Sequence, residues 1–361
     1  MFDSHHFVPI LKWKRAEQGA LKELFTEQKK YITPLIQFVM PKPKLNESFE
    51  DLVVRFENLA PEIPDKIIEV WGSNPIFIDV SLLFTSPLKT KSLEIIARRG
   101  CECHAKFIPV IHLNDDEAIK KVAYKLAREN GTGFCLRLIC TDFSDIEKLN
   151  QNLAALLSKS GLKEKDIDLL VDIKETDENG NKYSHFLNLS QNITNLLKWR
   201  TYIFAAGSFP EDLSKCKPDE ENLIPRVEWN CWKNSVSDNK LKRKPTFADY
   251  TIQHPIYKEA TQFYPPTTSI KYALENDWLI MKGKKQKYEL YLASAALLVD
   301  DSRFYGEKFS SGDNYISAKA KHFAIYIKNR AVKGTGSTET WLKAGINHHL
   351  SLVTHLIANL P

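Results

Sequence analysis

Apolar and polar positions follow two alternating patterns over roughly the first 210 residues. Short runs rich in apolar and β-branched residues predict strands at 7–12, 32–39, 75–81, 106–113, 133–140, 167–175 and 201–208. Between them, apolar residues at helical spacing predict helices at 16–31, 48–60, 90–100, 115–131, 144–161 and 186–200. This alternation is typical of parallel strands joined by crossover helices.

An eighth strand would let such a sheet close on itself. Residues 246–255 are the candidate for that strand, and 221–235 for the helix before it. We therefore predict an α/β fold, a (β/α)8 TIM-like barrel. A doubly wound open parallel sheet is the alternative, because periodicity does not distinguish a closed sheet from an open one. Gly100 is expected to cap the helix at 90–100.

The pattern changes after residue 265. Residues 268–285 predict a β-hairpin, 288–301 a helix, 304–317 a polar loop and 340–360 a final helix. We therefore expect a barrel over 1–265 and a C-terminal α+β extension over 266–361 that packs on it.

Composition narrows the class of protein. Hydrophobic residues make up 43% of the 361, which is enough for a substantial core. The formal charge of +5 is too small for the dense basic surface of a dedicated nucleic-acid binder. Six scattered cysteines are expected to be free thiols. The chain shows neither a signal-peptide pattern nor a long apolar span, so we expect a cytoplasmic protein with no membrane partner.

Several catalytic signatures are absent from the sequence. There is no phosphate-binding P-loop, no dinucleotide-binding glycine motif, and neither the H-E-x-x-H nor the G-x-S-x-G motif. The segment 101–104 (CECH) offers three metal-ligand residue types, but no second cluster completes a tetrahedral shell, so we predict a turn and no metal site there.

Polar residues interrupt the predicted strands near their C-terminal ends, where a barrel of this type keeps its binding site. They are Lys12, Lys14, Gln37, Asp79, His112, Arg137, Asp172, Lys174 and Ser208. Lys12, Lys14, Arg137 and Lys174 are candidates for binding an anion. Asp79, Asp172 and His112 are candidate catalytic acid/base groups, and the two carboxylates are candidate ligands of a divalent cation. The alternative is an internal network of salt bridges without catalysis.

Two other segments carry candidate chemistry. In the final helix the adjacent His348 and His349 cannot share one face, so at most one would point at a site, and solvated helix surface is the favoured interpretation. Trp229 and Trp232 precede a basic stretch at 240–244 and could stack on bases of a nucleic acid. A helix with a buried tryptophan face followed by a solvated basic loop is the favoured alternative.

Several segments together resemble the "beta protein" family of phages, plasmids and bacterial mobile elements. They are VPILKWKRAEQGAL, PLIQF, IDVS, VDIKE, SIKYALENDWLIMKG, FYGEKFSSGDNYI and WLKAGINHHL, and they span almost the whole chain. The resemblance implies a role in phage-host conflict, in defence or counter-defence. It implies no particular reaction, because the family has no assigned catalytic mechanism. Gln37 stands where the resemblance leads us to expect an acidic residue, and Lys271, a further candidate binding residue, where it leads us to expect arginine.

Two hypotheses follow for function. The first is a barrel enzyme, either a hydrolase, for example of the phosphodiesterase kind, or a transferase, whose mouth binds a phosphate-bearing ligand such as a nucleotide or nucleic acid. The second is a non-enzymatic scaffold that recognises a protein partner of a defence system, or a nucleic acid, through its surface.

Overall fold

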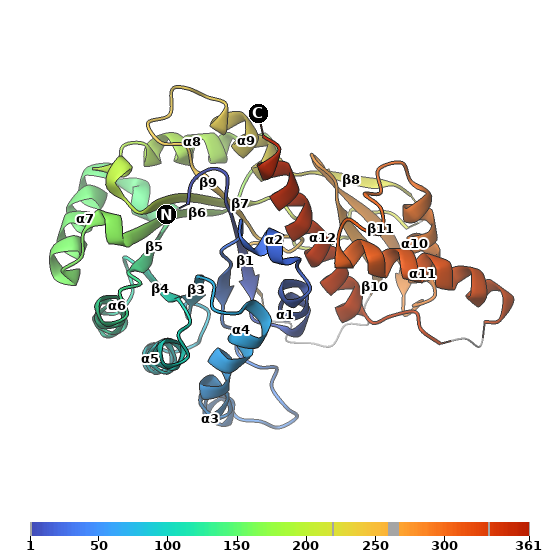
Figure 1. Cartoon of the computed structure of the whole chain (residues 1–361), viewed down its shortest axis with the longest axis horizontal. Helices are drawn as coiled ribbons and strands as arrows, with labels where there is room; N and C mark the ends of the chain where they lie inside the picture. Colours follow the sequence, from blue (N-terminus) through green and yellow to red (C-terminus); the bar gives the residue numbers. More distant parts are fainter. Residues whose placement is uncertain (1, 219, 259–266, 331–332, 361) are drawn as a thin grey trace.

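Eight parallel strands close into a barrel in the computed structural model, which describes residues 2–218, 220–258, 267–330 and 333–360 (Figure 1). The barrel strands are β1 (Phe7–Lys12), β2 (Leu35–Gln37), β3 (Ile76–Asp79), β4 (Phe107–His112), β5 (Phe134–Ile139), β6 (Ile167–Glu175), β7 (Thr201–Gly207) and β9 (Thr246–Asp249). Because β9 pairs with both β7 and β1, the sheet is closed. This confirms the predicted TIM-like barrel and rules out the open sheet.

Helices cover the outside of this barrel (Figure 1). They are α1 (Arg15–Lys22), α2 (Thr26–Lys29), α3 (Phe49–Leu59), α4 (Ile63–Trp71), α5 (Ser86–Glu102), α6 (Glu117–Glu129), α7 (Ile146–Ser160), α8 (Asn181–Ser190) and α9 (Val227–Val236). The predicted helix at 16–31 is interrupted at Phe25, whose backbone is extended. The sequence pattern did not predict α4. Pro61 and Pro64 nevertheless lie in the first turn of a helix, where the missing backbone N–H of proline breaks no hydrogen bond.

A second sheet packs beside the barrel. It is antiparallel, in the order β10 (Thr267–Ala273), β11 (Asp277–Lys285) and β8 (Asn222–Pro225). The predicted helix at 221–235 is therefore wrong over its first residues, where alternating half-buried and exposed side chains form β8, and the helix begins only at Val227. β8 thus precedes residue 265 in sequence but belongs to the sheet of the C-terminal segment.

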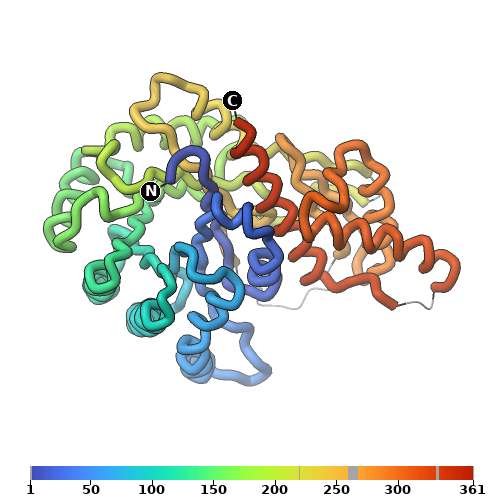
Figure 2. The backbone as a smooth tube through the Cα atoms, in the orientation of Figure 1, coloured from blue at the N-terminus to red at the C-terminus, as the bar shows by residue number. Residues whose placement is uncertain are grey.

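Three helices complete the C-terminal segment: α10 (Leu290–Asp300), α11 (Ser311–Lys328) and α12 (Thr338–Ala358). The predicted polar loop at 304–317 is wrong over its second half, because Ser310 accepts a hydrogen bond from the Asp313 N–H and starts α11. At the C-terminal end of the chain, α12 lies beside the N-terminal helix α1 (Figure 2). There the side-chain amide of Asn347 donates to the Ala20 carbonyl, at 3.0 Å.

The side chains inside the barrel form a small apolar core of their own. It contains Val8, Ile10, Leu35, Phe77, Ile108, Val110, Cys135, Leu170, Ile203, Ala205, Ala248 and Tyr250. The outward-facing strand residues join a larger core with the helices, as the alternation of side chains along a strand requires. Within the described ranges, no helix combines the length and the apolar character needed to cross a bilayer.

Gly100 does not cap its helix as predicted, because α5 continues to Glu102 and ends at Cys103. Its role is steric. A Cβ atom at position 100 would lie 2.3 Å from the ring of the buried Phe107 on β4. The absence of a side chain at this position therefore allows the helix to pack against the barrel.

We expect Gly100→Ala to lower the free energy of unfolding by roughly 1–3 kcal/mol, because the clash with Phe107 exceeds the ~1 kcal/mol that alanine gains in a helix. Chemical denaturation measures this value. In a Phe107→Ala background the same change should cost less or become stabilising. An equal cost in both backgrounds would contradict the packing explanation.

Candidate functional site

The register of the strands brings polar residues together at the C-terminal end of the barrel. Lys12, Gln37 and Asp79 are aligned across β1, β2 and β3, and His112 pairs with Arg137 across β4 and β5. Each follows, by two positions, an apolar residue of the inner core, so its side chain points to the same interior. The strands thus form a layer of polar side chains above the apolar core.

Arg137 lies at the centre of this layer, with its side chain fully buried. Its Nε and Nη2 donate to one oxygen of Asp172 at 3.0 and 2.6 Å, and Nη1 donates to Asp79. Nη2 also donates to the hydroxyl of Tyr250, at 2.8 Å. The guanidinium therefore connects β3, β6 and the residue that follows β9.

Tyr250 and Lys174 complete the bonding around Asp172. The Tyr250 hydroxyl donates to Asp172 at 2.7 Å and accepts from Lys174 Nζ at 3.0 Å. Lys174 Nζ also lies 3.0 Å from the same carboxylate oxygen. The backbone of Lys174 has a positive φ of 60°, and the pairing of β6 with β7 shifts register between Asp172 and Glu175.

Both carboxylates are held in the ionised form. Burial raises the pKa of Asp79, but Arg137 and hydrogen bonding by Ser81 outweigh it and leave the pKa below its usual value. For Asp172, burial is likewise outweighed, here by Lys174 and Arg137, and its pKa is also lowered. Arg137 donates to Oδ2 of both carboxylates, and the backbone N–H groups of Ser81 and Lys174 donate to Oδ1 of Asp79 and Asp172, so protein donors contact all four oxygens.

Gln37 supports the same network. Its amide donates to Asp79 Oδ2 at 3.2 Å. An acidic residue, expected here from the family resemblance, would place a second carboxylate against Asp79. In this chain position 37 therefore orients Asp79 rather than supplying an acid.

Lys12 differs from the other buried cations of the layer. Its side chain is only 2% exposed, yet no described carboxylate lies within ion-pair distance of its ammonium group. Its contacts are a long 3.5 Å hydrogen bond to the His254 carbonyl and the ring of Tyr250, whose centroid is 5.2 Å away. Burial, reinforced by Lys174, lowers the pKa of Lys12 to about 8.

His112 also has unused bonding capacity. Its Nε2 is buried and has no hydrogen-bond partner among the described residues. Burial is the main cause that lowers the pKa of the His112 ring below its usual value. Asp79 raises this pKa and Arg137 lowers it, and the net effect is a ring that is neutral at pH 7. Of the three candidate catalytic residues, it is the one whose side chain has a polar atom without a partner among the described residues.

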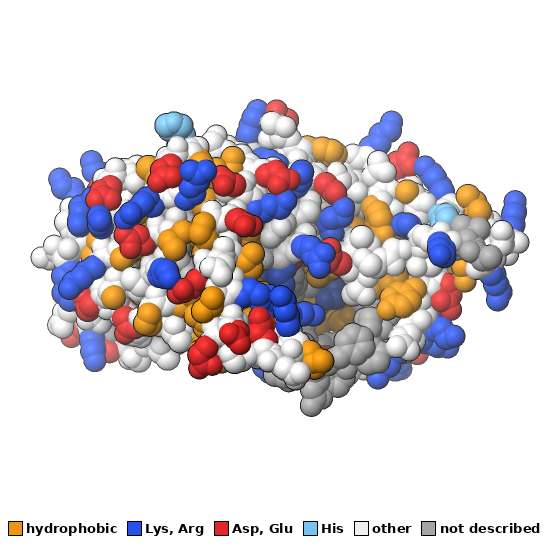
Figure 3. Space-filling view, turned by 90° about the horizontal axis from the view of Figure 1, so that it is seen from below, with side chains coloured by type: hydrophobic (Ala, Val, Ile, Leu, Met, Phe, Trp, Pro, Cys, Tyr) orange, Lys and Arg blue, Asp and Glu red, His pale blue; other side chains and the backbone are white. Residues whose placement is uncertain are grey.

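The segment that follows β9 crosses the end of the barrel. The His254 ring pairs with Glu175 at 2.6 Å, Gln253 donates to the buried Glu17 at 2.8 Å, and Lys14 Nζ donates to the Tyr257 hydroxyl at 3.0 Å. Seen from below, the surface is hollowed near the middle of the molecule, and Lys and Arg side chains gather beside the hollow (Figure 3). Lys14 thus contacts the segment that follows β9.

The remaining predicted residues lie elsewhere. Ser208 donates to the Pro225 carbonyl and accepts from the Val227 N–H, so it joins β7 to the start of α9. Lys271 is on β10 and donates to the Ile252 carbonyl at 3.4 Å, in a separate cavity.

The expected solvent exposure of His348 and His349 is wrong. Both are fully buried, because α12 is enclosed between the barrel and the second sheet. His348 contacts Asp313 at 2.8 Å and the Ala273 carbonyl at 2.8 Å, on the side of the second sheet. His349 contacts Asp249 of β9 at 2.7 Å. Adjacent histidines do face different ways, and each is buried by a different part of the fold.

The tryptophans before the basic stretch pack into the core. Trp229 and Trp232 are buried against Phe247 of β9, so they cannot stack on bases, and the favoured alternative is confirmed for both. In the CECH segment, Cys101 and Glu102 belong to α5 rather than to a turn. Among the described residues, no group of three or more His, Cys, Asp or Glu side chains is arranged to hold a metal ion.

The sequence reading missed Tyr250 and Glu17. Tyr250 follows β9 at inward-facing parity, two positions after Ala248, but counts as apolar in a hydrophobicity pattern. Glu17 lies in the first turn of α1, where acids are ordinary, and its burial raises its pKa.

Comparison with known proteins gives one family and no individual relative. No curated protein and no solved structure matches the chain. The family described as Beta protein matches residues 7–355, from the first residue of β1 into the last turns of α12. This match covers nearly the whole chain, and the protein therefore belongs to the Beta protein family.

Proposed function

We propose that the mouth of the barrel binds a phosphate-bearing ligand, a nucleotide or a nucleic-acid segment, with Lys12 as its principal contact. The observation that carries this proposal is the burial of Lys12 without a carboxylate partner among the residues that the structure describes. A buried ammonium group without a counterion is costly, and an anion that enters the site would offset that cost.

The other charged groups divide into a frame and a binding surface. Arg137, Asp79 and Asp172 satisfy one another and form the frame. Lys174 is bonded to Asp172, but its side chain is 33% exposed and can contact a ligand. The three cations Lys12, Arg137 and Lys174 outnumber the two carboxylates of the layer, so the site favours an anion.

His112 favours a catalytic form of this function. If a ligand brings water to the buried Nε2, the neutral imidazole can accept a proton from that water as its oxygen bonds to phosphorus. The P–O bond to the leaving alcohol then breaks, and the protonated imidazole returns the proton to the leaving oxygen. We therefore propose hydrolysis of a phosphodiester as the reaction class. A non-enzymatic scaffold with a protein partner is the alternative, and it would stand if no phosphate compound bound.

The family resemblance supports the biological setting. Because it points to phages and mobile elements, we propose that this protein acts in phage-host conflict, in defence or counter-defence. A cytoplasmic location stays a prediction from the sequence.

We expect Lys12→Met to weaken binding of ATP and of the dinucleotide ApA at least tenfold in isothermal titration calorimetry. The same change should raise the free energy of unfolding by roughly 1–3 kcal/mol, because it removes a buried charge. Each unit by which the pKa of Lys12 is lowered corresponds to about 1.4 kcal/mol by which the folded protein disfavours the charged form. Lys12→Arg should retain binding. Lys22→Met, at an exposed lysine of α1, is the control of equal charge. Unchanged affinity in Lys12→Met, or no binding by the native protein, would refute the proposal.

Binding of ApA should weaken as pH rises through about 8, because Lys12 then loses its proton in the folded protein. Between pH 8 and the ordinary lysine pKa of 10.5, Lys12 is protonated in the unfolded chain but deprotonated in the folded protein. Its contribution to the free energy of unfolding should therefore increase with pH over this range. Calorimetry at successive pH values tests the first effect. The decline should disappear in Lys12→Arg, since arginine stays protonated; a pH-independent affinity in the native protein would contradict this role.

Arg137→Met should lower the free energy of unfolding by about 3–5 kcal/mol, since it removes the ion-pair partner of buried Asp79 and leaves buried Asp172 with Lys174 alone. Chemical denaturation, with Arg137→Lys expected to be intermediate, measures the loss. If Arg137→Met lowers the free energy of unfolding by less than Lys12→Arg does, Arg137 does not hold the two carboxylates of the frame in place.

A further inference from the structure

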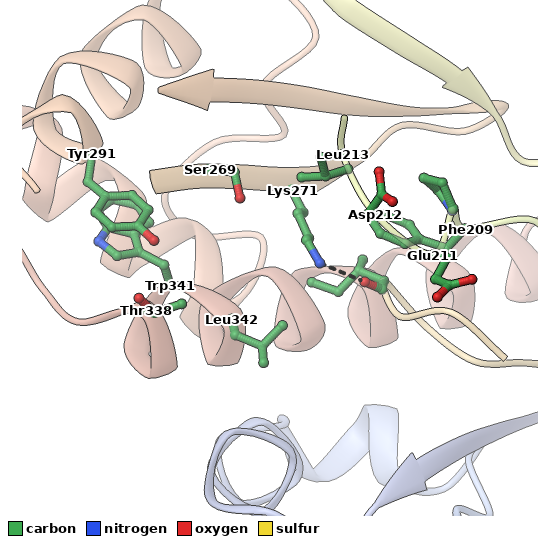
Figure 4. A pocket seen from close by; sticks show the side chains of 12 residues that line it. Phe209, Glu211, Asp212, Leu213, Ser269, Lys271, Tyr291, Thr338, Trp341 and Leu342 are labelled. Atoms are coloured by element: carbon green, nitrogen blue, oxygen red, sulfur yellow. Dashed lines mark hydrogen bonds between the residues drawn. The ribbon is translucent and has the colours of Figure 1, made fainter. Parts of the chain in front are cut away.

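A cavity of about 250 Å³ lies between the rim of the barrel and the C-terminal segment (Figure 4). Its walls come from the loops after β7 and β9, from β10, and from α10 and α12. The residues that matter for its chemistry are Phe209, Glu211, Lys271, Tyr291 and Trp341. The cavity is therefore distinct from the polar layer inside the barrel.

Lys271 supplies the positive charge of this cavity. Its ammonium group lies 4.6 Å from the centroid of the Phe209 ring and 3.4 Å from the Ile252 carbonyl oxygen, which is a long hydrogen bond. No described carboxylate forms an ion pair with it. Burial lowers the pKa of Lys271 to about 8, so most molecules carry the charge at pH 7 without a counterion.

The two acidic residues of the lining are bonded elsewhere. Glu211 pairs with Lys258 at 2.7 Å, and Asp212 accepts from the Ser214 N–H at 2.7 Å. Figure 4 shows their carboxylates pointing away from Lys271. The charge that faces the cavity is consequently the single ammonium group.

A flat aromatic wall lies on the other side. Tyr291 and Trp341 stack with their ring centroids 4.8 Å apart and an interplanar angle of 8°. The Trp341 Nε1 donates to the Thr335 carbonyl at 2.9 Å, which fixes the ring. Leu342 and Ile252 add aliphatic surface. Such walls bind planar apolar groups, and the polar group of a ligand then selects its orientation.

We propose that this cavity is a second binding site, for a small organic monoanion with a planar apolar body, whose carboxylate binds Lys271 while its ring lies toward Trp341. The volume limits the ligand to about the size of a two-ring aromatic acid. A single cation favours a monoanion over a doubly charged phosphate. The proposal is independent of what the mouth of the barrel binds, because the two sites use different lysines.

Isothermal titration calorimetry of the full chain with 2-naphthoate, and with its neutral isostere 2-naphthamide, tests this site. The acid should bind at least tenfold more tightly than the amide. Lys271→Met should remove that preference, and Lys271→Arg should keep it. Lys285→Met removes an exposed lysine of the same sheet outside the cavity and should have no effect.

The control outcomes separate this site from the mouth of the barrel. Lys12→Met should leave naphthoate binding unchanged. Equal binding of acid and amide, loss of naphthoate binding in Lys12→Met, or undiminished binding in Lys271→Met would each overturn the proposal. If the Lys271 variants fail to fold, selective broadening of the Trp341 indole resonance by naphthoate in the native protein decides the question, and its absence would also overturn it.

Discussion

The bonding of Arg137 to Asp79 and Asp172 is the interaction on which the barrel mouth depends. It joins strands that are distant in sequence and donates to Oδ2 of both carboxylates. Tyr250 extends the network to the strand that closes the barrel. Arg137 and the two carboxylates together carry one negative charge, which Lys174 offsets, so the charge of Lys12 is left over and is the basis of the anion binding that we propose.

The frame could be predicted from the sequence because barrel geometry is regular. Asp79, Arg137 and Asp172 each interrupt an apolar run, and parallel strands bring their C-terminal ends to one mouth. The boundaries predicted for the sixth strand, 167–175, are those observed for β6. Tyr250 was missed since its role depends on one hydroxyl group, which a hydrophobic pattern does not register.

The C-terminal segment was harder to predict because its partners are remote. Nothing near His348 and His349 shows that one contacts Asp313 and the other Asp249, some 35 and 100 residues away. Likewise, β8 is a short strand whose hydrogen-bonding partner, β11, comes about 50 residues later. Local periodicity carries no information about such pairings, whereas each barrel strand pairs with the next barrel strand along the chain, apart from the β1–β9 pair that closes the sheet.

The position of β8 also constrains how the chain can reach its native state. During synthesis β8 emerges between the barrel strands β7 and β9. Its backbone N–H and C=O groups cannot form their sheet hydrogen bonds until β11 has been synthesised. Formation of the second sheet therefore requires contacts of high sequence separation, which slow folding. A fragment that ends at residue 265 would keep β8 as an orphan strand, with its N–H and C=O groups open to pairing with another molecule.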